Sequence, residues 1–282
     1  MSGFARLFGK LEALPGLESL SDGIARALTP VTKQRALMDV LHGRWIGHAI
    51  HPALSDLPIG LWSGASLLDL CGDEQGATVM TAAGCASAVA TAATGTADWS
   101  VTAGRDRRLA LVHGLANSAV LGIQIGALVA RVRGHRRLGQ LLGAAGLGSS
   151  AAAAYVGGEL VFGRGLMVDH GAFTAGPSKW TQVLADEELL DGKIQAVDVD
   201  GRKVLLARID GTVSAIENAC SHAGGPLCEG TVADGVVTCP WHGSRFRLSD
   251  GAVLGGPATF PQLQLQVRRR KGQIEIRGRE ST

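Results

Sequence analysis

The chain has 282 residues, a formal net charge of +2 and 46% hydrophobic residues, with 40 glycines. This length is sufficient for two domains. The near balance of charge argues against the concentrated basic face of a nucleic-acid-binding protein, so we expect no nucleic-acid partner. The five cysteines are an odd number, which does not fit a disulfide framework and favours a reducing compartment or metal ligation.

The segment 1–45 contains amphipathic stretches, notably 4–14 and 23–28. We expect it to be an interfacial N-terminal segment. It has no compact apolar run followed by a small-residue cleavage site, so a cleaved signal peptide is not expected.

The next segment, 46–170, is poor in charged residues and predicts a four-helix transmembrane domain. A helix needs roughly 20 residues to cross the hydrocarbon core of a bilayer. The apolar runs lack the polar face of a soluble surface helix, although a buried soluble bundle is the alternative. Short loops between them predict an antiparallel bundle in the lipid bilayer. We place the four spans at 53–72, 76–97, 109–130 and 138–162.

Lys and Arg residues near the predicted helix ends indicate the orientation, because cytoplasmic loops are enriched in them. With the N-terminus inside, the inner segments carry more of these residues than the outer loops. The sequence therefore predicts a multi-pass protein of the cell membrane with both termini, and the domain after the last span, in the cytoplasm. The inner set is Lys33, Arg35, Arg44, Arg105, Arg107, Arg108, Arg164 and Lys179, and the outer set is Arg131, Arg133, Arg136 and Arg137.

Two histidines, His51 and His113, fall near the predicted starts of the first and third spans. Polar residues at membrane depth are costly and therefore informative. One interpretation is a helix cap with hydrogen bonds in the headgroup zone. The other is a pair of imidazoles that ligate a b-type haem, or that contact a quinone or a metal.

The first predicted span begins with His51-Pro52, followed by Leu54 and Pro58. This pattern resembles an uncharacterised family of small four-helix membrane proteins whose first span begins His-Pro-x-Leu. The resemblance covers about 45–170. It implies a membrane topology and no specific chemistry.

After a Gly/Pro/Ser linker at 171–179, the segment 180–282 changes to the alternating pattern of β-strands. The dipeptides Asp200-Gly201 and Asp210-Gly211 predict tight hairpin turns, because Asp and Gly tolerate positive φ. We therefore expect a small antiparallel all-β domain. Its predicted strands are 193–199, 203–209, 212–216, 235–238, 244–248, 263–267 and 273–276.

Two short motifs in this domain each offer one thiolate and one imidazole: Cys220-Ser-His222 and Cys239-Pro-Trp-His242. Two thiolates on one iron and two imidazoles on the other would hold a [2Fe-2S] cluster. A zinc site is the alternative, but zinc sites usually pair cysteine with cysteine and histidine with histidine.

Around these four residues the sequence resembles Rieske [2Fe-2S] domains over about 179–278. Residues 223–227 resemble the first cluster loop, 242–244 the second, and 255–258 with Pro261 the proline loop that covers the cluster. The resemblance implies that Cys220 and Cys239 bind the inner iron and that His222 and His242 bind the outer, solvent-facing iron. It also places Gly225, Trp241, Ser244 and Pro257 around the cluster.

Some positions depart from the Rieske proteins of respiratory complexes. Gly225 and Trp241 stand where those proteins carry an extra disulfide, and Cys228 has no evident partner. Ser244 matches a hydroxyl that bonds a bridging sulfur, whereas Phe246 replaces a tyrosine hydroxyl. Fewer hydrogen bonds to the sulfurs disfavour the reduced cluster, so we expect a potential in the lower to middle part of the Rieske range.

Together these patterns predict an all-α four-helix transmembrane bundle followed by an all-β Rieske-type [2Fe-2S] domain. We expect a membrane-anchored ferredoxin that carries single electrons between unidentified donor and acceptor proteins. The alternatives are a two-cofactor membrane oxidoreductase with a haem or quinone site, and a cluster-based sensor. A complete oxygenase is not expected, since it would need a larger iron domain after the cluster and the chain ends 40 residues past His242.

Overall fold

The computed structural model describes residues 3–278 of the chain, with side chains from residue 7 onward. These residues form two compact units. The helical unit comprises the residues up to Gly43 together with Ala49–Leu166, and the β-rich unit comprises Arg44–His48 together with the residues from Met167 onward. The predicted fold class, an all-α four-helix domain followed by an all-β domain, is confirmed.

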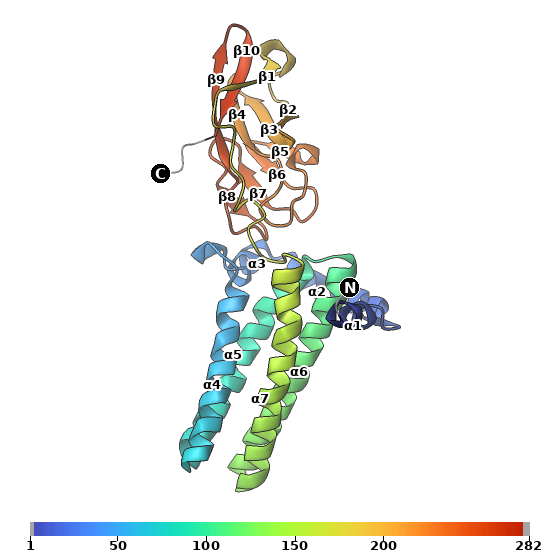
Figure 1. Cartoon of the computed structure of the whole chain (residues 1–282), viewed down its shortest axis with the longest axis vertical. Helices are drawn as coiled ribbons and strands as arrows, with labels where there is room; N and C mark the ends of the chain where they lie inside the picture. The colour runs from blue at the N-terminus through green and yellow to red at the C-terminus, as the bar shows by residue number, and fades with distance from the viewer. Residues whose placement is uncertain (1–2, 279–282) are drawn as a thin grey trace. The chain divides into compact units, whose positions relative to one another are not determined.

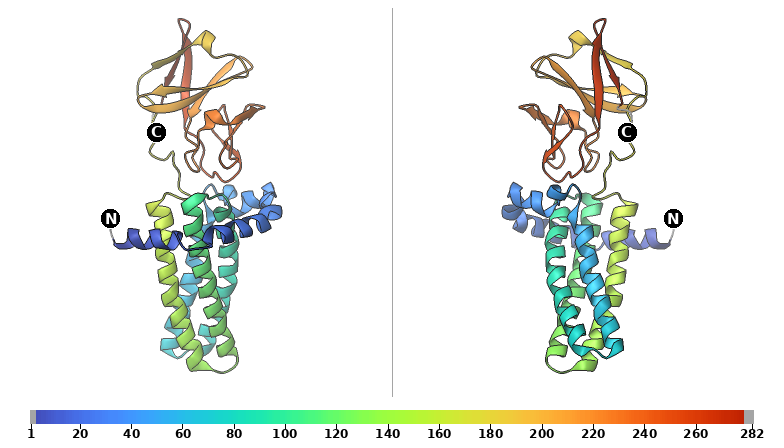
Figure 2. Two further views of the ribbon diagram at one scale, coloured as in Figure 1. Left: turned by 90° about the vertical axis from the view of Figure 1, so that its right-hand side faces the viewer. Right: turned by 90° about the vertical axis from the view of Figure 1, so that its left-hand side faces the viewer.

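Three short helices precede the bundle, and they lie across one end of its long helices (Figure 2). They are α1 (Gly3–Glu12), α2 (Leu17–Thr32) and α3 (Arg35–Leu41). The carboxylate of Glu12 attaches α1 to the bundle, because it is 3% exposed and accepts hydrogen bonds from both Arg105 and Arg164. The pKa of Glu12 is lowered to about 2, chiefly by its hydrogen bond from Arg164 and also by Arg105.

The long helices make up the rest of this unit (Figure 1). Each of them contacts the next along the chain, and the fourth also contacts the first, so α4 and α6 lie on one diagonal of the bundle. Gly72 and Gly134 end α4 and α6 with φ of 84° and 79°, a conformation that glycine adopts without strain. The helices are α4 (Ile50–Cys71), α5 (Glu74–Ser100), α6 (Gly104–Val132) and α7 (Arg136–Gly158), and a π-helix (Glu159–Gly163) extends α7.

The bundle buries many small and polar residues and leaves many large apolar side chains exposed. Among the described helices, α5 and α6 are long and apolar enough to cross a membrane by length and composition. Inside, Asp69 and Arg131 form a bidentate ion pair, with the shorter side-chain contact at 2.5 Å. Large exposed side chains on the long helices include Leu67, Leu70, Val79, Val89, Val132 and Leu141.

The β-rich unit contains two antiparallel sheets (Figure 1). The six-stranded sheet has the order β1-β10-β9-β4-β3-β2, and the four-stranded sheet has the order β5-β6-β7-β8. The strands of the larger sheet are β1 (Thr181–Ala185), β2 (Ile194–Val199), β3 (Arg202–Ile209), β4 (Thr212–Glu217), β9 (Gln264–Arg270) and β10 (Gln273–Arg277). Those of the smaller sheet are β5 (Thr231–Ala233), β6 (Val236–Thr238), β7 (Arg245–Arg247) and β8 (Val253–Gly255).

The two predicted hairpin turns are confirmed. Asp200 and Gly201 have φ of 53° and 78°, and Asp210 and Gly211 have φ of 49° and 73°. Two further turns of the same kind join β5 to β6 at residues 234–235 and β9 to β10 at residues 271–272. The sequence analysis missed β1, β5 and β8. These strands are short and lie at sheet edges, where one side of the strand has no partner strand. The alternation of polar and apolar residues is weak in them.

Candidate functional site

Two loops of the β-rich unit carry the four predicted ligand residues, and their backbones follow the same pattern. In the first loop the N–H of Cys220 donates to the Gly225 carbonyl at 2.8 Å, and the N–H of Gly224 donates to the Cys220 carbonyl at 2.7 Å. In the second loop Cys239 donates to the Ser244 carbonyl at 2.8 Å, and the residue after His242 donates to the Cys239 carbonyl at 3.1 Å. The fifth residue of each loop is glycine with φ of 73°. Each loop is therefore a tight turn that aims one cysteine inward.

The thiols of Cys220 and Cys239 are buried and lie within hydrogen-bonding distance of one another. This contact lowers the pKa of Cys239, and the same contact together with burial raises the pKa of Cys220. Backbone amides approach both sulfurs: those of His222 and Ala223 at Cys220, and those of Trp241 and His242 at Cys239. One shared negative charge is thus stabilised between two thiols, which is the environment that thiolate ligands need.

The imidazoles of His222 and His242 form a second pair, with ring centroids 5.0 Å apart and ring planes at 88°. The Nδ1 atom of His242 is buried and has no hydrogen-bond partner among residues 3–278. Burial also lowers the pKa of His242, which favours the neutral form of its ring. His222 is only 8% exposed, so the solvent-facing edge comes from His242 and from Trp241, which is 56% exposed.

The donor set fits a two-iron cluster. The four side chains divide into a thiol pair and an imidazole pair, as ligation of two different irons requires. The orphaned Nδ1 of His242 is a buried nitrogen whose lone pair needs a partner, and a metal ion would supply one. Within the described part of the chain, no group of three or more His, Cys, Asp or Glu side chains is arranged around a single ion position.

The residues expected around the cluster also lie at these loops. A Cβ at Gly225 would come within 3.0 Å of both the Cys239 sulfur and the Trp241 ring. The hydroxyl of Ser244 is fully buried and accepts a hydrogen bond from the N–H of Ala258 at 3.1 Å. Its own proton remains available to a further acceptor.

Two neighbouring side chains lack polar groups. Pro257, in the loop before β9, is buried next to Ala258. Phe246 is fully buried in the core cluster that also contains Cys220 and Cys239. The described contacts of Cys228 are with this core, where it packs as a half-buried free thiol.

Sequence reasoning missed several residues that hold the first loop. The hydroxyl of Ser221 donates to the Phe260 carbonyl at 2.7 Å, and its carbonyl accepts from the N–H of His170 at 2.9 Å. With its amide oriented to suit both neighbours, Gln262 donates to the Ala219 carbonyl and accepts from the Ser221 N–H. No spacing rule signals these contacts, because each partner is distant in sequence.

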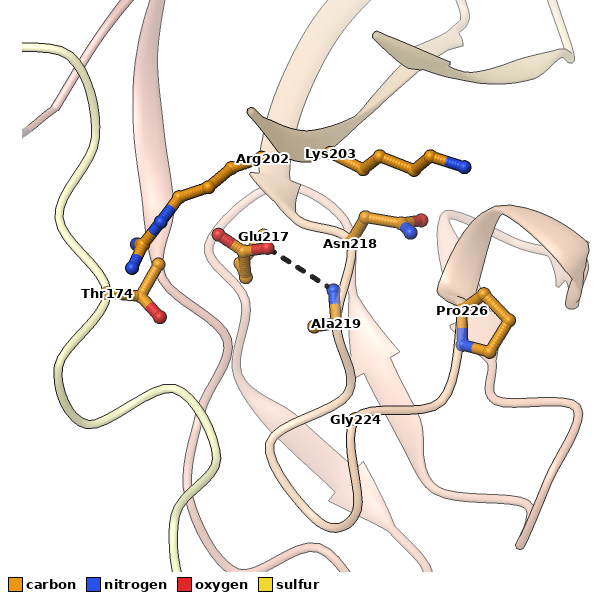
Figure 3. Close-up of a pocket in the computed structure, with 8 residues that line it drawn as sticks. All are labelled: Thr174, Arg202, Lys203, Glu217, Asn218, Ala219, Gly224 and Pro226. Atoms are coloured by element: carbon orange, nitrogen blue, oxygen red, sulfur yellow. Dashed lines mark hydrogen bonds between the residues drawn. The ribbon is translucent and has the colours of Figure 1, made fainter. Parts of the chain in front are cut away.

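A pocket of about 350 Å³ lies at the base of the first loop (Figure 3). Arg202 and Lys203 line it on one side, and the buried carboxylate of Glu217 accepts from the Ala219 N–H at 3.4 Å. Burial raises the pKa of Glu217. The lining does not include the four predicted ligand residues, so the pocket is separate from the paired thiols and imidazoles.

The remaining candidates, His51 and His113, lie in the helical unit and are brought together there. Their ring centroids are 6.5 Å apart, and their ring planes are nearly perpendicular at 88°. The Nδ1 of His51 is 3.0 Å from the Thr91 carbonyl oxygen, and the Nδ1 of His113 is 3.0 Å from the Ala153 carbonyl oxygen.

Comparisons with known proteins match both halves of the chain. Residues 179–267 match the family model described as Rieske [2Fe-2S] domain, and residues 47–176 match the one described as predicted membrane protein (DUF2231). Neither description refers to haem. The two families together confirm the predicted fusion.

Several relatives match the β-rich unit. The ferredoxin component of the naphthalene 1,2-dioxygenase system of Pseudomonas putida is 30% identical over 81 residues, which are 29% of this chain and 78% of the relative. Apoptosis-inducing factor 3 of Mus musculus is 34% identical over 91 residues, or 32% of this chain, and the chain spans only 15% of its length. The ferredoxin of carbazole 1,9a-dioxygenase from Nocardioides aromaticivorans IC177 is a similar solved structure, with 31% identity and a TM-score of 0.35. That match covers 36% of this chain and all of the ferredoxin.

The paired thiols and imidazoles on two matching loops therefore agree with the sequence relatives. The geometry of the site and the sequence relatives both support an electron-carrying Rieske [2Fe-2S] domain. Through residues 179–267 the chain belongs to the Rieske [2Fe-2S] family, and this domain follows a DUF2231 domain at residues 47–176.

Proposed function

We propose that this protein is a membrane-anchored Rieske-type ferredoxin that passes single electrons between protein partners. Cys220 and Cys239 would hold one iron of the cluster, and His222 and His242 the other. The observation that carries this proposal is the division of the four side chains into a thiol pair and an imidazole pair on two loops of equivalent backbone geometry. A [2Fe-2S] cluster bound there supplies a one-electron redox couple.

The protein's own groups have separate tasks in this proposal. Backbone amides of residues 222, 223, 241 and 242 face the cysteine sulfurs and stabilise negative charge on them. The buried hydroxyl of Ser244 is positioned by Ala258 and can donate to a sulfur. His242 and the exposed indole of Trp241, with ring centroids 6.3 Å apart, offer the edge at which an electron would leave.

Electron paramagnetic resonance spectroscopy of the purified full-length protein tests whether the cluster is present. The dithionite-reduced protein in detergent is expected to give a rhombic electron paramagnetic resonance signal with average g below 2, the signature of a Rieske cluster. Cys239→Ser should abolish this signal, whereas Cys228→Ser should keep it, because Cys228 is a free thiol outside the ligand pairs. No signal from wild-type protein after iron and sulfide reconstitution would overturn the proposal.

Membrane anchoring is supported by the match to a predicted membrane protein family, by two sufficiently apolar helices and by the large apolar side chains on the outside of the bundle. Exposed Leu and Val side chains are favourable in lipid and unfavourable in water. We propose that all four long helices cross the cell membrane with both termini in the cytoplasm. A reporter that works only in the cytoplasm should be active when it is fused after residue 282. A reporter that works only after export should be active when it is inserted at Gly134.

The similar ferredoxins are components of dioxygenase systems. We infer that the donor is a reductase and the acceptor a metal-containing oxidoreductase, each reached through the His242 and Trp241 edge. Trp241→Ala should then slow electron transfer to an oxygenase-type acceptor without removing the cluster signal.

A two-cofactor membrane oxidoreductase, with a b-type haem or a quinone in the helical domain, is the second candidate function. The observation that favours it is the approach of His51 to His113, at 6.5 Å between ring centroids. An optical spectrum of the same detergent-purified protein separates the two functions, because only the second produces a haem band.

A further inference from the structure

The helical unit consists of two equivalent helical hairpins, α4–α5 and α6–α7. Each residue of the first hairpin corresponds to the residue 62 positions later, as Gly134 follows Gly72. The turns at these glycines are the same: Gly72 donates to the Asp69 carbonyl at 3.2 Å, and Gly134 donates to the Arg131 carbonyl at 3.0 Å. The following residue in each turn donates to the carbonyl five positions earlier, at 2.9 Å in the first hairpin and 2.8 Å in the second.

The contacts within each hairpin repeat at the same offset. A Cβ at Gly84 would come within 2.4 Å of the Trp62 side chain, and a Cβ at Gly146 within 2.6 Å of the Gln124 side chain. Residues 62 and 124 are equivalent, as are residues 84 and 146. Identical residues at equivalent positions include His51 and His113, Gly60 and Gly122, Gly64 and Gly126, Ala65 and Ala127, Gly84 and Gly146, and Gly95 and Gly157.

His51 and His113 therefore occupy equivalent positions in the two hairpins, and their imidazole rings make equivalent contacts. Each Nδ1 faces a backbone carbonyl oxygen 40 positions later, at 3.0 Å in both hairpins. Each ring also lies against a glycine, because a Cβ would be 2.6 Å from Cε1 of His51 at Gly95 and 2.8 Å from Cε1 of His113 at Gly157. Both glycines are thus needed for the rings to fit.

These contacts define which ring nitrogen donates. A carbonyl oxygen only accepts hydrogen bonds, so each Nδ1 donates its proton to the carbonyl, and in the neutral ring Nε2 is the nitrogen with a free lone pair. Metal-ligating histidines are oriented in this manner, with the second nitrogen donating to a carbonyl. The side-chain nitrogen of Asn117 lies 3.3 Å from Nε2 of His113, but its shorter contact, at 2.9 Å, is to the His113 carbonyl.

The two rings approach each other from helices on one diagonal of the bundle, α4 and α6. Two imidazoles bound on opposite sides of one metal ion at about 2.0 Å would have ring centroids roughly 6 Å apart. The observed separation of 6.5 Å is close to this value. Nearly perpendicular ring planes are compatible with axial ligation on opposite sides of a flat macrocycle.

The residues around the histidine pair favour a metal ion whose other ligands come from a cofactor and not from the protein. A protein-bound metal ion without a macrocycle takes four or more ligands, whereas a haem iron needs only two from the protein. In residues 3–278, no third His, Cys, Asp or Glu joins this pair. The walls beside the pair, on α5 and α7, are formed by small residues at the contact positions: Thr91, Thr94, Gly95, Ala153 and Gly157.

We propose that the helical domain is a duplicated helical hairpin whose equivalent histidines, His51 and His113, bind one b-type haem between them across the centre of the bundle. This inference deepens the two-cofactor function and does not depend on the ligands of the β-rich domain.

The test is a titration of the full-length detergent-solubilised protein with haemin, followed by optical spectra before and after dithionite reduction. Wild-type protein should bind one haem per chain and show the sharp α band of a six-coordinate reduced haem. His51→Ala and His113→Ala should each remove six-coordination and weaken binding by 10-fold or more, to similar extents because the positions are equivalent. His135→Ala is the matched control, since this histidine precedes α7 at the opposite end of the hairpin, and it should bind haem like wild type.

Gly95→Ala and Gly157→Ala provide a second pair of variants, since each added methyl group would displace one imidazole while both histidines remain. Each should shift the spectrum away from the six-coordinate form. Circular dichroism at the helical band, measured in the same samples, reports that the helical unit of the variants is folded. Failure of wild type to bind haemin, binding of Zn²⁺ by the pair in preference to haem, or a six-coordinate spectrum in the double His51→Ala, His113→Ala variant would overturn the haem site. Loss of the Rieske signal alone would instead overturn the ferredoxin function.

Discussion

The indole of Trp241 lies over the backbone of Gly225, so close that a Cβ on residue 225 would be 3.0 Å from its Cγ atom. The same Cβ would be 3.0 Å from the Cys239 sulfur. In the Rieske proteins of respiratory complexes, which this domain resembles, these two positions carry cysteines that form a disulfide. Here an aromatic ring over a glycine fills the same space.

This contact predicts that the double variant Gly225→Cys, Trp241→Cys forms a disulfide. A Cβ at residue 225 would be 3.0 Å from the Cγ of Trp241. That Cγ is bonded to the Cβ of residue 241, so the two Cβ atoms would be at most about 4.5 Å apart, within the reach of a disulfide. Mass spectrometry after alkylation should find both new thiols protected under oxidising conditions. The single variant Trp241→Cys should be alkylated fully, and alkylation of both cysteines in the double variant would contradict the prediction.

Replacement of Ser244 by alanine should lower the midpoint potential of the cluster by about 40 mV. The hydroxyl of Ser244 is buried, is positioned by Ala258 and is free to donate to a cluster sulfur. One net hydrogen bond stabilises by about 1 kcal/mol, and a one-electron potential changes by 59 mV for each tenfold change in equilibrium constant. Protein-film voltammetry measures the shift.

Ser221→Ala is the control for this potential, because the Ser221 hydroxyl already donates to the Phe260 carbonyl at 2.7 Å. It should change the potential much less. An equal shift in both variants would mean that the Ser244 hydroxyl has no specific effect on the reduced state.

The carboxylate of Glu12 should stabilise the helical domain in a pH-dependent way. Its pKa is lowered from 4.5 to about 2, chiefly by the hydrogen bond from Arg164. Because the folded-state pKa is the lower one, this stabilisation is complete above about pH 4.5 and is lost as the pH falls through the folded value. The shift corresponds to roughly 3 kcal/mol at neutral pH.

Glu12→Gln should therefore lower the thermal stability of the detergent-solubilised protein at pH 7, and the difference from wild type should shrink toward pH 3. Circular dichroism at the helical band measures it. Glu18→Gln is the control, since this carboxylate is exposed and 3.9 Å from Arg108. A pH-independent difference for Glu12→Gln would show that packing, and not charge, is responsible.

The ion pair between Asp69 and Arg131 should tolerate exchange of its partners. The two residues occupy equivalent positions of the duplicated hairpin and contact each other inside the bundle. Asp69→Arg or Arg131→Asp alone leaves two like charges buried together and should destabilise by about 3 to 5 kcal/mol.

The double variant Asp69→Arg, Arg131→Asp restores opposite charges at the same two sites, so it should recover most of the lost stability. Thermal unfolding of the four proteins in one detergent gives the coupling free energy. A double variant no more stable than the single variants would argue against equivalence of the two hairpins.

The sequence alone determined the elements with strong local signals. Long apolar runs between charged turns indicated the long helices, and the Asp-Gly pairs at residues 200–201 and 210–211 indicated hairpins, because both signals arise within a few residues. The family resemblance rested on two short motifs, Cys220 to His222 and Cys239 to His242, whose spacing is read directly. The edge strands β1, β5 and β8 gave weak signals, since their pairing is set by distant strands.

Only the tertiary structure decided which distant residues meet. The duplicated hairpin has few identical residues, and it became visible through repeated contacts, such as those of Gly84 with Trp62 and Gly146 with Gln124. The approach of His51 to His113 and the position of Trp241 over Gly225 also depend on helix packing and loop folding. These relationships join residues far apart in the chain, and local propensity carries no information about them.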